Sequence, residues 1–550
     1  MRRLLLVGVF ACSSRPTTPH YANFDALAAA VLDHYYRASP AEAVSLGLHD
    51  RDGELPDISP TGLEATVSRL RADKAALEAV DATKLTETQR EELGALLQHV
   101  RSDLFDRVER DVYRTNPMTY SSAIDLDAFV VRDYAPASQR AAAVAKLCSA
   151  LPAFLARARA NIDTPVPKSW ADTALLQTKG LAEFVDHDVR QALGSQPALD
   201  TCKSALAEHA QWLKAKQDTA TTEFALGAER FLQMLTDEEG ITIDLPALAE
   251  LARVDLERNT KALEEAAHAI DPSKPVPEVV AAVEADRPTP ETVLAEATQQ
   301  ATEMRKFLVD HQIVTIPSDE TCEVRPSPPF QRWNAAFMDG PGPFETKKLP
   351  SFYYISPPDP SWSKEDQLAY IPSRGDLLFT TVHEVYPGHF IHALVIHKNP
   401  SRVLQALRSY STSEGWAHYT EEMMYEAGAG GHTPQAHIGQ LLEALLRNVR
   451  FVVAIGEHTG GMTVAEAEAL FRDRAFLDNG NAHQQAVRGT FDPMFLAYTV
   501  GKLAILKMRT DWMAKHPGAT LGQFHDAFLS HGAAPLSVIR KAMLGDTQVL

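Results

Sequence analysis

Apolar residues recur three or four positions apart along most of the chain, and this helical spacing restricts the possible folds more than any other feature of the sequence. The pattern is clear from Phe24 to Tyr35, where Leu27, Val31 and Leu32 occupy one side of a helix. Alanine-rich stretches with charged residues and high helix propensity continue at 87–108, 139–160 and 206–234. We therefore predict a mainly α protein with many helices.

The sequence changes character after about residue 303, where short β-branched and aromatic runs occur. Residues 313–316 are Ile-Val-Thr-Ile, and residues 351–356 are Ser-Phe-Tyr-Tyr-Ile-Ser. Pro350 and Pro357 flank the second run, and proline near a strand favours an edge position. We expect a small edge β-sheet beside the helix of the motif described below. In this sheet Tyr354 either aligns an extended substrate by strand addition or serves as scaffold.

The length of the chain favours more than one packing unit. At 550 residues it exceeds the roughly 250–300 residues at which a single hydrophobic core stops growing. Prolines at 326–329 lie close to the change in character. We predict a leader and tether at 1–20, a helical N-terminal lobe at 21–325, and a lobe with the candidate catalytic residues at 326–550.

The first residues have the pattern of an export signal. Arg2 and Arg3 precede an apolar run at 4–11 that is far too short to span a bilayer, and Cys12 follows. Residues 9–12, Val-Phe-Ala-Cys, resemble a bacterial lipobox, in which Cys12 becomes the acylated first residue. The prediction is a lipid-anchored protein of the cell envelope or periplasm, and the alternative is an ordinary cytoplasmic N-terminus.

Charge and cysteine content argue against a nucleic-acid-binding protein and against a fold held together by many disulfides. There are 53 basic and 72 acidic side chains, which gives a net charge of −19. Such a surface repels nucleic acid and anionic lipid, so contact with a membrane is expected only through Cys12. Cys148, Cys202 and Cys322 are odd in number, so at most one disulfide can form among them. We expect these three to be buried packing residues.

The segment HEVYPGH, which begins at His383, contains the residue types of a catalytic zinc site. Zinc is bound there by imidazole and carboxylate, and a glutamate beside the first histidine serves as general base. His383 and His389 are six positions apart, a rotation of about 240° that places them on different faces of a regular helix. Pro387 and Gly388 can kink the helix and return His389 to the side of His383. We predict zinc bound to both histidines, with Glu384 as the base.

A second predicted helix offers the third ligand. Glu414, His418 and Glu421 lie at offsets of four and seven, so they share one stripe of that helix. We choose Glu414 as the ligand, with His418 and Glu421 supporting the ligands from behind, and the fourth position stays open for water. His418 and Glu421 remain alternative ligands. If none of the three binds a metal, they form an exposed charged stripe on the helix.

Three further residues are candidates for contacts with a substrate. Arg450 can hold a peptide carboxylate through two parallel hydrogen bonds, although a structural ion pair with Glu443 or Glu457 is at least an equal alternative. Tyr498 and His458 are candidates to donate a hydrogen bond to an oxyanion in the transition state. A tyrosine on an otherwise apolar helix is, however, more often a core residue.

These motifs resemble those of a known bacterial family. HEVYPGH followed by SEGWAHYTE is similar to the two central motifs of the domain of unknown function 885 family, whose members look like zinc metallopeptidases and are often predicted lipoproteins. The resemblance extends from residues 40–49 to a late block with Arg450, Arg488, Pro493 and Tyr498. It implies a helical, gluzincin-like peptidase with the same three ligands and the same base. It also makes Arg488 a substrate-binding candidate beside Arg450.

The chain departs from the family pattern beside the metal motif. Val385 stands where the family usually has glycine, Phe390 where it has a second histidine, and His392 where it has glutamine. None of these positions is a proposed ligand, so the prediction of a zinc site is retained.

The leading hypothesis is therefore a peptidase that acts on short peptides with Zn²⁺ as its cofactor. A zinc amidase or esterase would use the same residues. A di-iron bundle requires two inward Glu-x-x-His pairs, and only Glu265–His268 fits that pattern. The remaining alternative is a catalytically inactive, lipid-anchored binding protein with a structural metal. Glu384 argues against it, because a structural site needs no general base.

Overall fold

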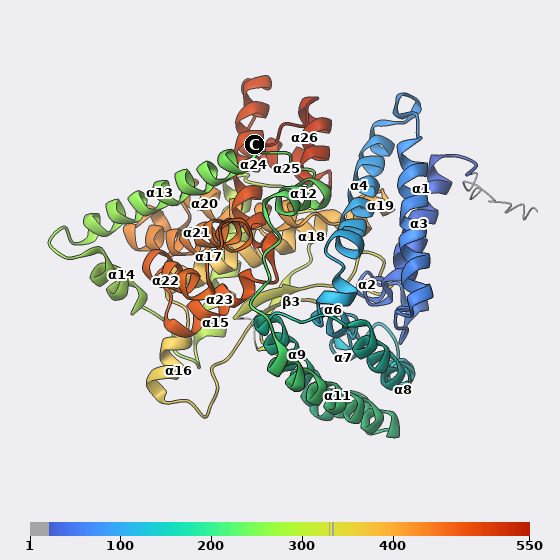
Figure 1. Cartoon of the computed structure of the whole chain (residues 1–550). Helices are drawn as coiled ribbons and strands as arrows, with labels where there is room; N and C mark the ends of the chain where they lie inside the picture. The colour runs from blue at the N-terminus through green and yellow to red at the C-terminus, as the bar shows by residue number, and fades with distance from the viewer. Residues whose placement is uncertain (1–20, 329–330, 333–334) are drawn as a thin grey trace, which may run out of the picture.

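The computed structural model describes residues 21–328, 331–332 and 335–550 and is built mainly from helices (Figure 1). The predicted leader at 1–20, with Cys12, lies outside these residues. The mainly α class with one small sheet is confirmed.

The helices before the sheet are α1 (Phe24–Ala38), α2 (Pro40–Ser45), α3 (Pro60–Glu78), α4 (Glu87–Leu104), α5 (Val112–Thr115), α6 (Met118–Ser122), α7 (Asp127–Val131), α8 (Ala137–Asn161), α9 (Lys168–Phe184), α10 (Arg190–Leu193), α11 (Pro197–Lys216), α12 (Ala228–Glu239), α13 (Leu245–Ile270), α14 (Val276–Glu284) and α15 (Val293–Asp310). Those after it are α16 (Lys364–Tyr370), α17 (Arg374–Glu384), α18 (His389–Lys398), α19 (Arg402–Ala406), α20 (Tyr410–Glu426), α21 (Pro434–Ile455), α22 (Val464–Ala475), α23 (Asn479–Gly489), α24 (Ala497–Lys515), α25 (Leu521–Leu529) and α26 (Leu536–Leu544).

Two hydrophobic clusters organise these helices. The larger joins apolar residues of α1, α3 and α4 with those of α12 to α15, the sheet and most helices from α17 onward. The smaller is formed mainly by α8, α9 and α11, which lie together at one side of the molecule in Figure 1. The larger cluster contains residues from both sides of position 325, and the division into lobes at that position stays a prediction.

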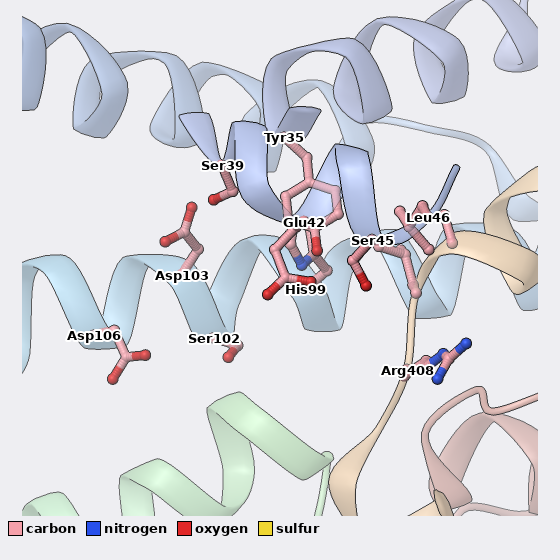
Figure 2. Close-up of a pocket in the computed structure, with 12 residues that line it drawn as sticks. Tyr35, Ser39, Glu42, Ser45, Leu46, His99, Ser102, Asp103, Asp106 and Arg408 are labelled. Carbon is pink, nitrogen blue, oxygen red and sulfur yellow. The ribbon is translucent and has the colours of Figure 1, made fainter. Parts of the chain in front are cut away.

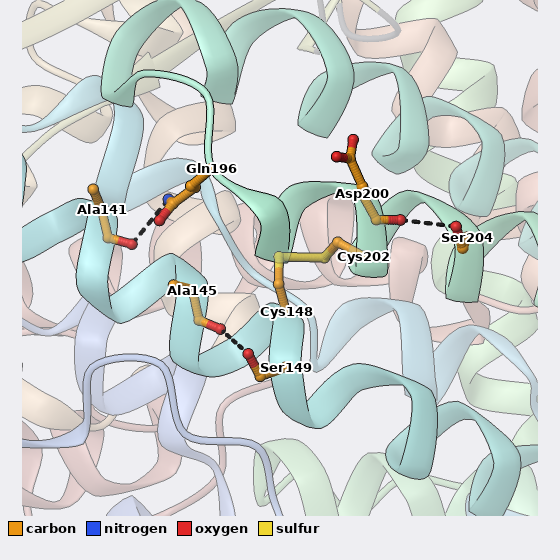
Figure 3. The surroundings of a disulfide bond; sticks show 8 residues. All are labelled: Ala141, Ala145, Cys148, Ser149, Gln196, Asp200, Cys202 and Ser204. Atoms are coloured by element: carbon orange, nitrogen blue, oxygen red, sulfur yellow. Dashed lines mark hydrogen bonds between the residues drawn. A yellow bond between two sulfur atoms is a disulfide. The ribbon is translucent and has the colours of Figure 1, made fainter.

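Helix α8 and its neighbours contain a disulfide. By length and composition alone α8 could cross a membrane, but Leu147 and Leu151 are buried in the smaller cluster, where α8 packs on α11. Cys148 of α8 and Cys202 of α11 are bonded across this packing (Figure 3). The expectation that they are only packing residues is therefore wrong, since helix packing joins two positions whose separation of 54 residues gives no such signal. Cys322 is a free thiol.

The sheet has three strands, β1 (Cys322–Pro326), β2 (Ala336–Asp339) and β3 (Ser351–Ile355), in the order β1-β3-β2. Strand β3 pairs in parallel with β1 and antiparallel with β2, and all of its residues are buried. The run from Ser351 is therefore the central strand, and the prediction of an edge position is wrong. Pro350 and Pro357 flank the ladder without interrupting it. Because both sides of β3 are paired, Tyr354 cannot align a substrate there by strand addition.

The β-branched run at residues 313–316 does not form a strand. Residues 313–316 have no regular secondary structure, and Ile313 and Val314 pack into the larger hydrophobic cluster. The backbone nitrogen and hydroxyl of Thr315 donate to the carboxylate of Asp526. These contacts satisfy the chain without a neighbouring strand.

Helices α20 and α24 cross at two glycines. A Cβ at Gly415 would lie 2.5 Å from the Cα of Gly501, and a Cβ at Gly501 would lie 2.1 Å from the carbonyl oxygen of Ser411. Only glycine permits such a close approach of two backbones. The crossing brings Glu414 of α20 and Tyr498 of α24 to the same part of the molecule.

Candidate metal centre

The two histidines of the HEVYPGH segment lie on separate helices. Helix α17 ends at Glu384 and α18 begins at His389, so the predicted kink is a complete break, which includes a cis peptide bond before Pro387. The break brings the rings of His383 and His389 to a centroid distance of 4.8 Å. The six-residue spacing is therefore compatible with a shared metal.

Close backbone contacts hold this break and require glycine. The nitrogen of Gly388 donates to the carbonyl oxygen of Val382 at 3.0 Å. A Cβ on Gly388 would lie 1.7 Å from the carbonyl oxygen of His383, which no side chain could tolerate. From the other side, the indole Nε1 of Trp416 donates to the carbonyl oxygen of Pro387 at 3.0 Å. The conformation between the two histidines is thus fixed by packing.

Glu414 of α20 faces both histidines. Its Oε2 atom lies 3.5 Å from Nε2 of His383 and 3.4 Å from Nε2 of His389, and this buried oxygen has no hydrogen-bond partner among the residues that the structure describes. Hydrogen bonds between such groups are shorter, near 2.7–2.9 Å. Two ligands about 2.1 Å from zinc at a tetrahedral angle lie about 3.4 Å apart. The observed separations therefore fit a tetrahedral ion bound to His383, His389 and Glu414.

Glu421 supports the first histidine from the opposite side of its ring. Oε1 of Glu421 lies 2.7 Å from Nδ1 of His383, and Oε2 lies 3.1 Å from Nδ1 of His418. A proton on Nδ1 of His383 leaves the Nε2 lone pair directed toward Glu414. These contacts suit the predicted role of Glu421 and His418 in orienting His383 better than their alternative roles as ligands. The guanidinium of Arg447, 3.6 Å from Glu421, balances part of the buried charge.

Buried charge makes the cluster favourable for a cation. Burial lowers the pKa of His383, but the neighbouring carboxylates of Glu414 and Glu421 outweigh burial, so the pKa lies above its usual range. Burial raises the pKa of Glu414, and the two neighbouring histidines outweigh it and hold that pKa well below its usual range. Ionised carboxylates in a buried place require a positive partner. A divalent ion on neutral imidazoles meets this requirement without protonating the histidines.

Glu384 borders the same centre. Its Oε2 accepts a hydrogen bond from the backbone nitrogen of Met338 on β2 at 2.8 Å, so the small sheet positions this carboxylate. One donor atom each from His383, Glu384 and His389 lie within 4.8 Å of one another, a second possible metal-binding set. Glu414 stays the predicted third ligand, because its Oε2 lies close to both histidines and has no hydrogen-bond partner among the described residues. With Glu414 in that role, Glu384 would be free to act as the predicted base.

Tyr498 and the arginines of the late block lie next to the centre. The ring of Tyr498 stacks near that of His383, with centroids 6.4 Å apart and an angle of 19° between the rings. The guanidinium of Arg450 lies 4.9 Å from the centre of the Tyr498 ring. Arg488 donates to the hydroxyl of Tyr410 at 2.9 Å, and the Tyr410 ring contacts Tyr498. These residues form one aromatic and cationic wall beside His383.

Tyr410 is a member of this wall that the sequence reasoning missed. It occupies the first position of α20, four residues before Glu414, so the two side chains lie on one face of the helix. That spacing was a usable signal. The burial of its hydroxyl raises the pKa of Tyr410 well above the usual range, and the neighbouring Tyr498 adds to this.

His458 does not join the centre. Its Nε2 donates to the carbonyl oxygen of Gly489 at 2.8 Å, while Nδ1 accepts from the backbone nitrogen of Leu226. The ring is buried and stacks on Phe231. These contacts give no support to the predicted transition-state role, because both nitrogens already have backbone partners.

A separate cavity of about 460 Å³ lies between α1, α2, α4 and the segment leading into α20 (Figure 2). Glu42, Asp103 and Asp106 line it, and Arg408 lies at its other side. Burial, assisted by Asp125, raises the pKa of Glu42. The cavity is lined by neither of the paired histidines nor by Glu414, so the candidate metal centre lies elsewhere.

Comparison with known proteins identifies the family. The model for "Bacterial protein of unknown function (DUF885)" matches residues 40–543, a span that contains every residue of the cluster. The chain belongs to this family. No curated protein matches this DUF885 chain.

Solved structures share the fold of this DUF885 protein. A "putative lipoprotein of unknown function" from Shewanella oneidensis is 25% identical with a TM-score of 0.79, covering 95% of this chain and 100% of its own. A "putative lipoprotein" from Colwellia psychrerythraea is 17% identical with the same TM-score of 0.79, covering 94% and 98%. An M32 carboxypeptidase from Deinococcus radiodurans R1 is 10% identical over 96% of both chains, and its TM-score of 0.41 is too low to support an argument.

Proposed function

We propose that this DUF885 protein is a zinc-dependent hydrolase that cleaves peptide bonds in short peptides. The observation that supports this most strongly is the position of Glu414. Within the described part of the chain its buried Oε2 lacks a hydrogen-bond partner, and it lies 3.4 Å and 3.5 Å from the two imidazole Nε2 atoms. Two nitrogen ligands and one carboxylate, with a fourth position free, are the usual set for catalytic zinc.

When bound, zinc lowers the pKa of its water toward neutrality and polarises the substrate carbonyl. Glu384 accepts the proton of the attacking water and transfers it to the leaving nitrogen. The backbone nitrogen of Met338 holds one oxygen of Glu384 in place, which leaves the other for the proton. Tyr498 is the candidate to donate a hydrogen bond to the carbonyl oxygen as negative charge develops there, because its ring lies beside His383.

We further propose that the protein works in the cell envelope, anchored by a lipid on Cys12. The Cys148–Cys202 disulfide supports an oxidising compartment. The two solved structures of the same fold, from Shewanella oneidensis and Colwellia psychrerythraea, are each described as a "putative lipoprotein". The anionic surface makes the lipid the expected membrane contact.

The Glu384→Gln variant tests the proposed function. We expect it to keep its zinc and its fold but to hydrolyse peptides about 10²–10⁴-fold more slowly, the usual contribution of a general base. Glu365→Gln, which alters an exposed residue of α16, is the matched control and should behave as wild type. A mixed peptide library and a set of amide and ester substrates should be assayed in parallel. Turnover of esters or simple amides without any peptide cleavage would replace the peptidase proposal, and unchanged hydrolysis in Glu384→Gln would refute the role of this base.

A further inference from the structure

Three arginines surround Tyr498, and two of them have acidic partners. Arg447 pairs with Glu443 on its own helix and also approaches Glu421. Arg488 pairs with Asp492 at 2.9 Å. Their positive charges are therefore balanced within the chain.

Arg450 is different. It is only 7% exposed, and among the described residues no carboxylate lies within 4.0 Å of its guanidinium. Its one side-chain hydrogen bond runs from Nε to Oε1 of Gln485 at 2.9 Å. Burial, with help from Arg488, lowers the pKa of Arg450 to about 10, so the side chain is still charged at neutral pH. The chain thus holds a buried cation next to the candidate metal centre without a carboxylate to balance it.

The free part of this guanidinium suits a carboxylate. Nε donates to Gln485, and this is the one hydrogen bond of the Arg450 side chain within the described chain, so both terminal nitrogens remain for a ligand. Two terminal nitrogens of a guanidinium bind both oxygens of a carboxylate through parallel hydrogen bonds. The contact with the Tyr498 ring and the hydrogen bond to Gln485 fix the plane of the group in advance. Preorganisation of this kind reduces the cost of ordering the side chain when a ligand binds.

The same Tyr498 ring links Arg450 to a metal ligand. It contacts the guanidinium at 4.9 Å and stacks near His383 with a centroid distance of 6.4 Å. In a peptide, the α-carboxylate is one residue away from the last peptide bond. A carboxylate held at Arg450 would therefore direct that bond, rather than an internal one, toward the centre.

We propose that Arg450 binds the free C-terminal α-carboxylate of the substrate, so that the enzyme removes residues from the C-terminal end of short peptides. This inference rests on the proposed peptidase function and specifies its substrate class. Arg450 is a substrate-binding residue, and it takes no part in proton transfer.

Matched peptides provide the test. Wild type, Arg450→Gln and Arg450→Lys are assayed with an N-acetylated tripeptide as the free acid and as the C-terminal amide. Arg472→Gln, which changes an arginine of α22 with a 38% exposed side chain, is the control. We expect wild type to prefer the acid by about 100-fold or more in kcat/KM, and Arg450→Gln to lose this preference mainly through a higher KM. Arg450→Lys should keep part of it, because one ammonium replaces the forked donor.

A binding measurement separates recognition from turnover. Calorimetry with zinc-loaded Glu384→Gln should detect N-acetyl-alanine but bind its amide at least about 10-fold more weakly, and the added Arg450→Gln change should remove the difference. Zinc content and circular dichroism of every variant verify the fold. Equal cleavage of acid and amide by wild type, or an acid preference kept in Arg450→Gln, would overturn the inference alone. Absence of hydrolysis of any peptide would overturn the proposed function and the inference with it.

Discussion

Replacing Gly388 by alanine should destroy the metal centre while leaving most of the protein folded. The added Cβ would lie 1.7 Å from the carbonyl oxygen of His383, 2.4 Å from its carbonyl carbon and 2.7 Å from the carbonyl oxygen of Val382. These are backbone atoms, so no rotation of a side chain can relieve the overlap. Restoring a normal carbon–oxygen contact requires a movement of roughly 1.5 Å, at an overpacking cost of about 1–3 kcal/mol or more.

Such a movement is large for a metal site, which tolerates deviations of about 0.2 Å in its ligand distances. It acts directly on His383, whose Nε2 lies 3.5 Å from Glu414. Changes that merely disturb the orientation of ligands already weaken metal binding about 10–100-fold. We therefore expect Gly388→Ala to bind zinc at least about 100-fold more weakly than wild type.

The dissociation constant for zinc is measured by competition with a chromogenic chelator, and the fold is checked by thermal unfolding. Gly180→Ala in α9 is the control, because a Cβ added to this exposed glycine would have no atom within 4 Å. It should bind zinc as wild type does and gain about 0.5–1 kcal/mol of stability. Wild-type zinc affinity in Gly388→Ala would refute the argument that this contact holds the two histidines together.

Other contacts give three further predictions. Glu421→Gln should weaken zinc binding about 10–100-fold, because Glu421 orients His383 through Nδ1; unchanged affinity in the chelator assay would contradict this. Replacing Cys148 and Cys202 together by serine should lower the free energy of unfolding by about 2–4 kcal/mol with zinc retained, since the disulfide closes a long loop away from the centre; loss of zinc would count against this separation. Burial raises the pKa of Glu457 from 4.5 to about 8, so the folded state holds this proton more tightly than the unfolded state. Stability should therefore fall as pH rises from about 4.5 to about 8, by at most about 1.4 kcal/mol per pH unit, and Glu457→Gln should flatten this part of the profile in denaturant titrations. A profile equally steep in the variant would show that another group is responsible.

The sequence predicted the helical class and the residues that meet at the candidate centre because both depend on local signals. Pro387 and Gly388 are residues that break helices. They lie in the break between α17 and α18, which brings His389 back to His383. The offsets of Glu414, His418 and Glu421 placed all three on one stripe. The sequence does not tell which of these side chains faces Nε2 of His383 and which faces Nδ1. The packing of α17 on α20 determines this, with Glu414 at Nε2 and Glu421 at Nδ1.

Other features depend on partners distant in the chain and could not be read from local patterns. The run at 351–356 looked like an edge strand because proline flanks it, whereas β1 and β2 pair with both of its sides. His458 looked available, but backbone groups from two other segments occupy both of its nitrogens. Arg450 could equally have formed an ion pair. In the described part of the chain it has no carboxylate partner, and Glu443 pairs with Arg447 instead.

The zinc content of the purified protein and of its His383→Ala, His389→Ala and Glu414→Ala variants tests the proposed metal centre most directly. Elemental analysis should find about one zinc per chain in wild type and a large loss in each variant, with folding verified by circular dichroism. Absence of zinc from correctly folded wild type, even after zinc is added back, would contradict the proposed zinc centre and leave the His–Glu cluster without a metal.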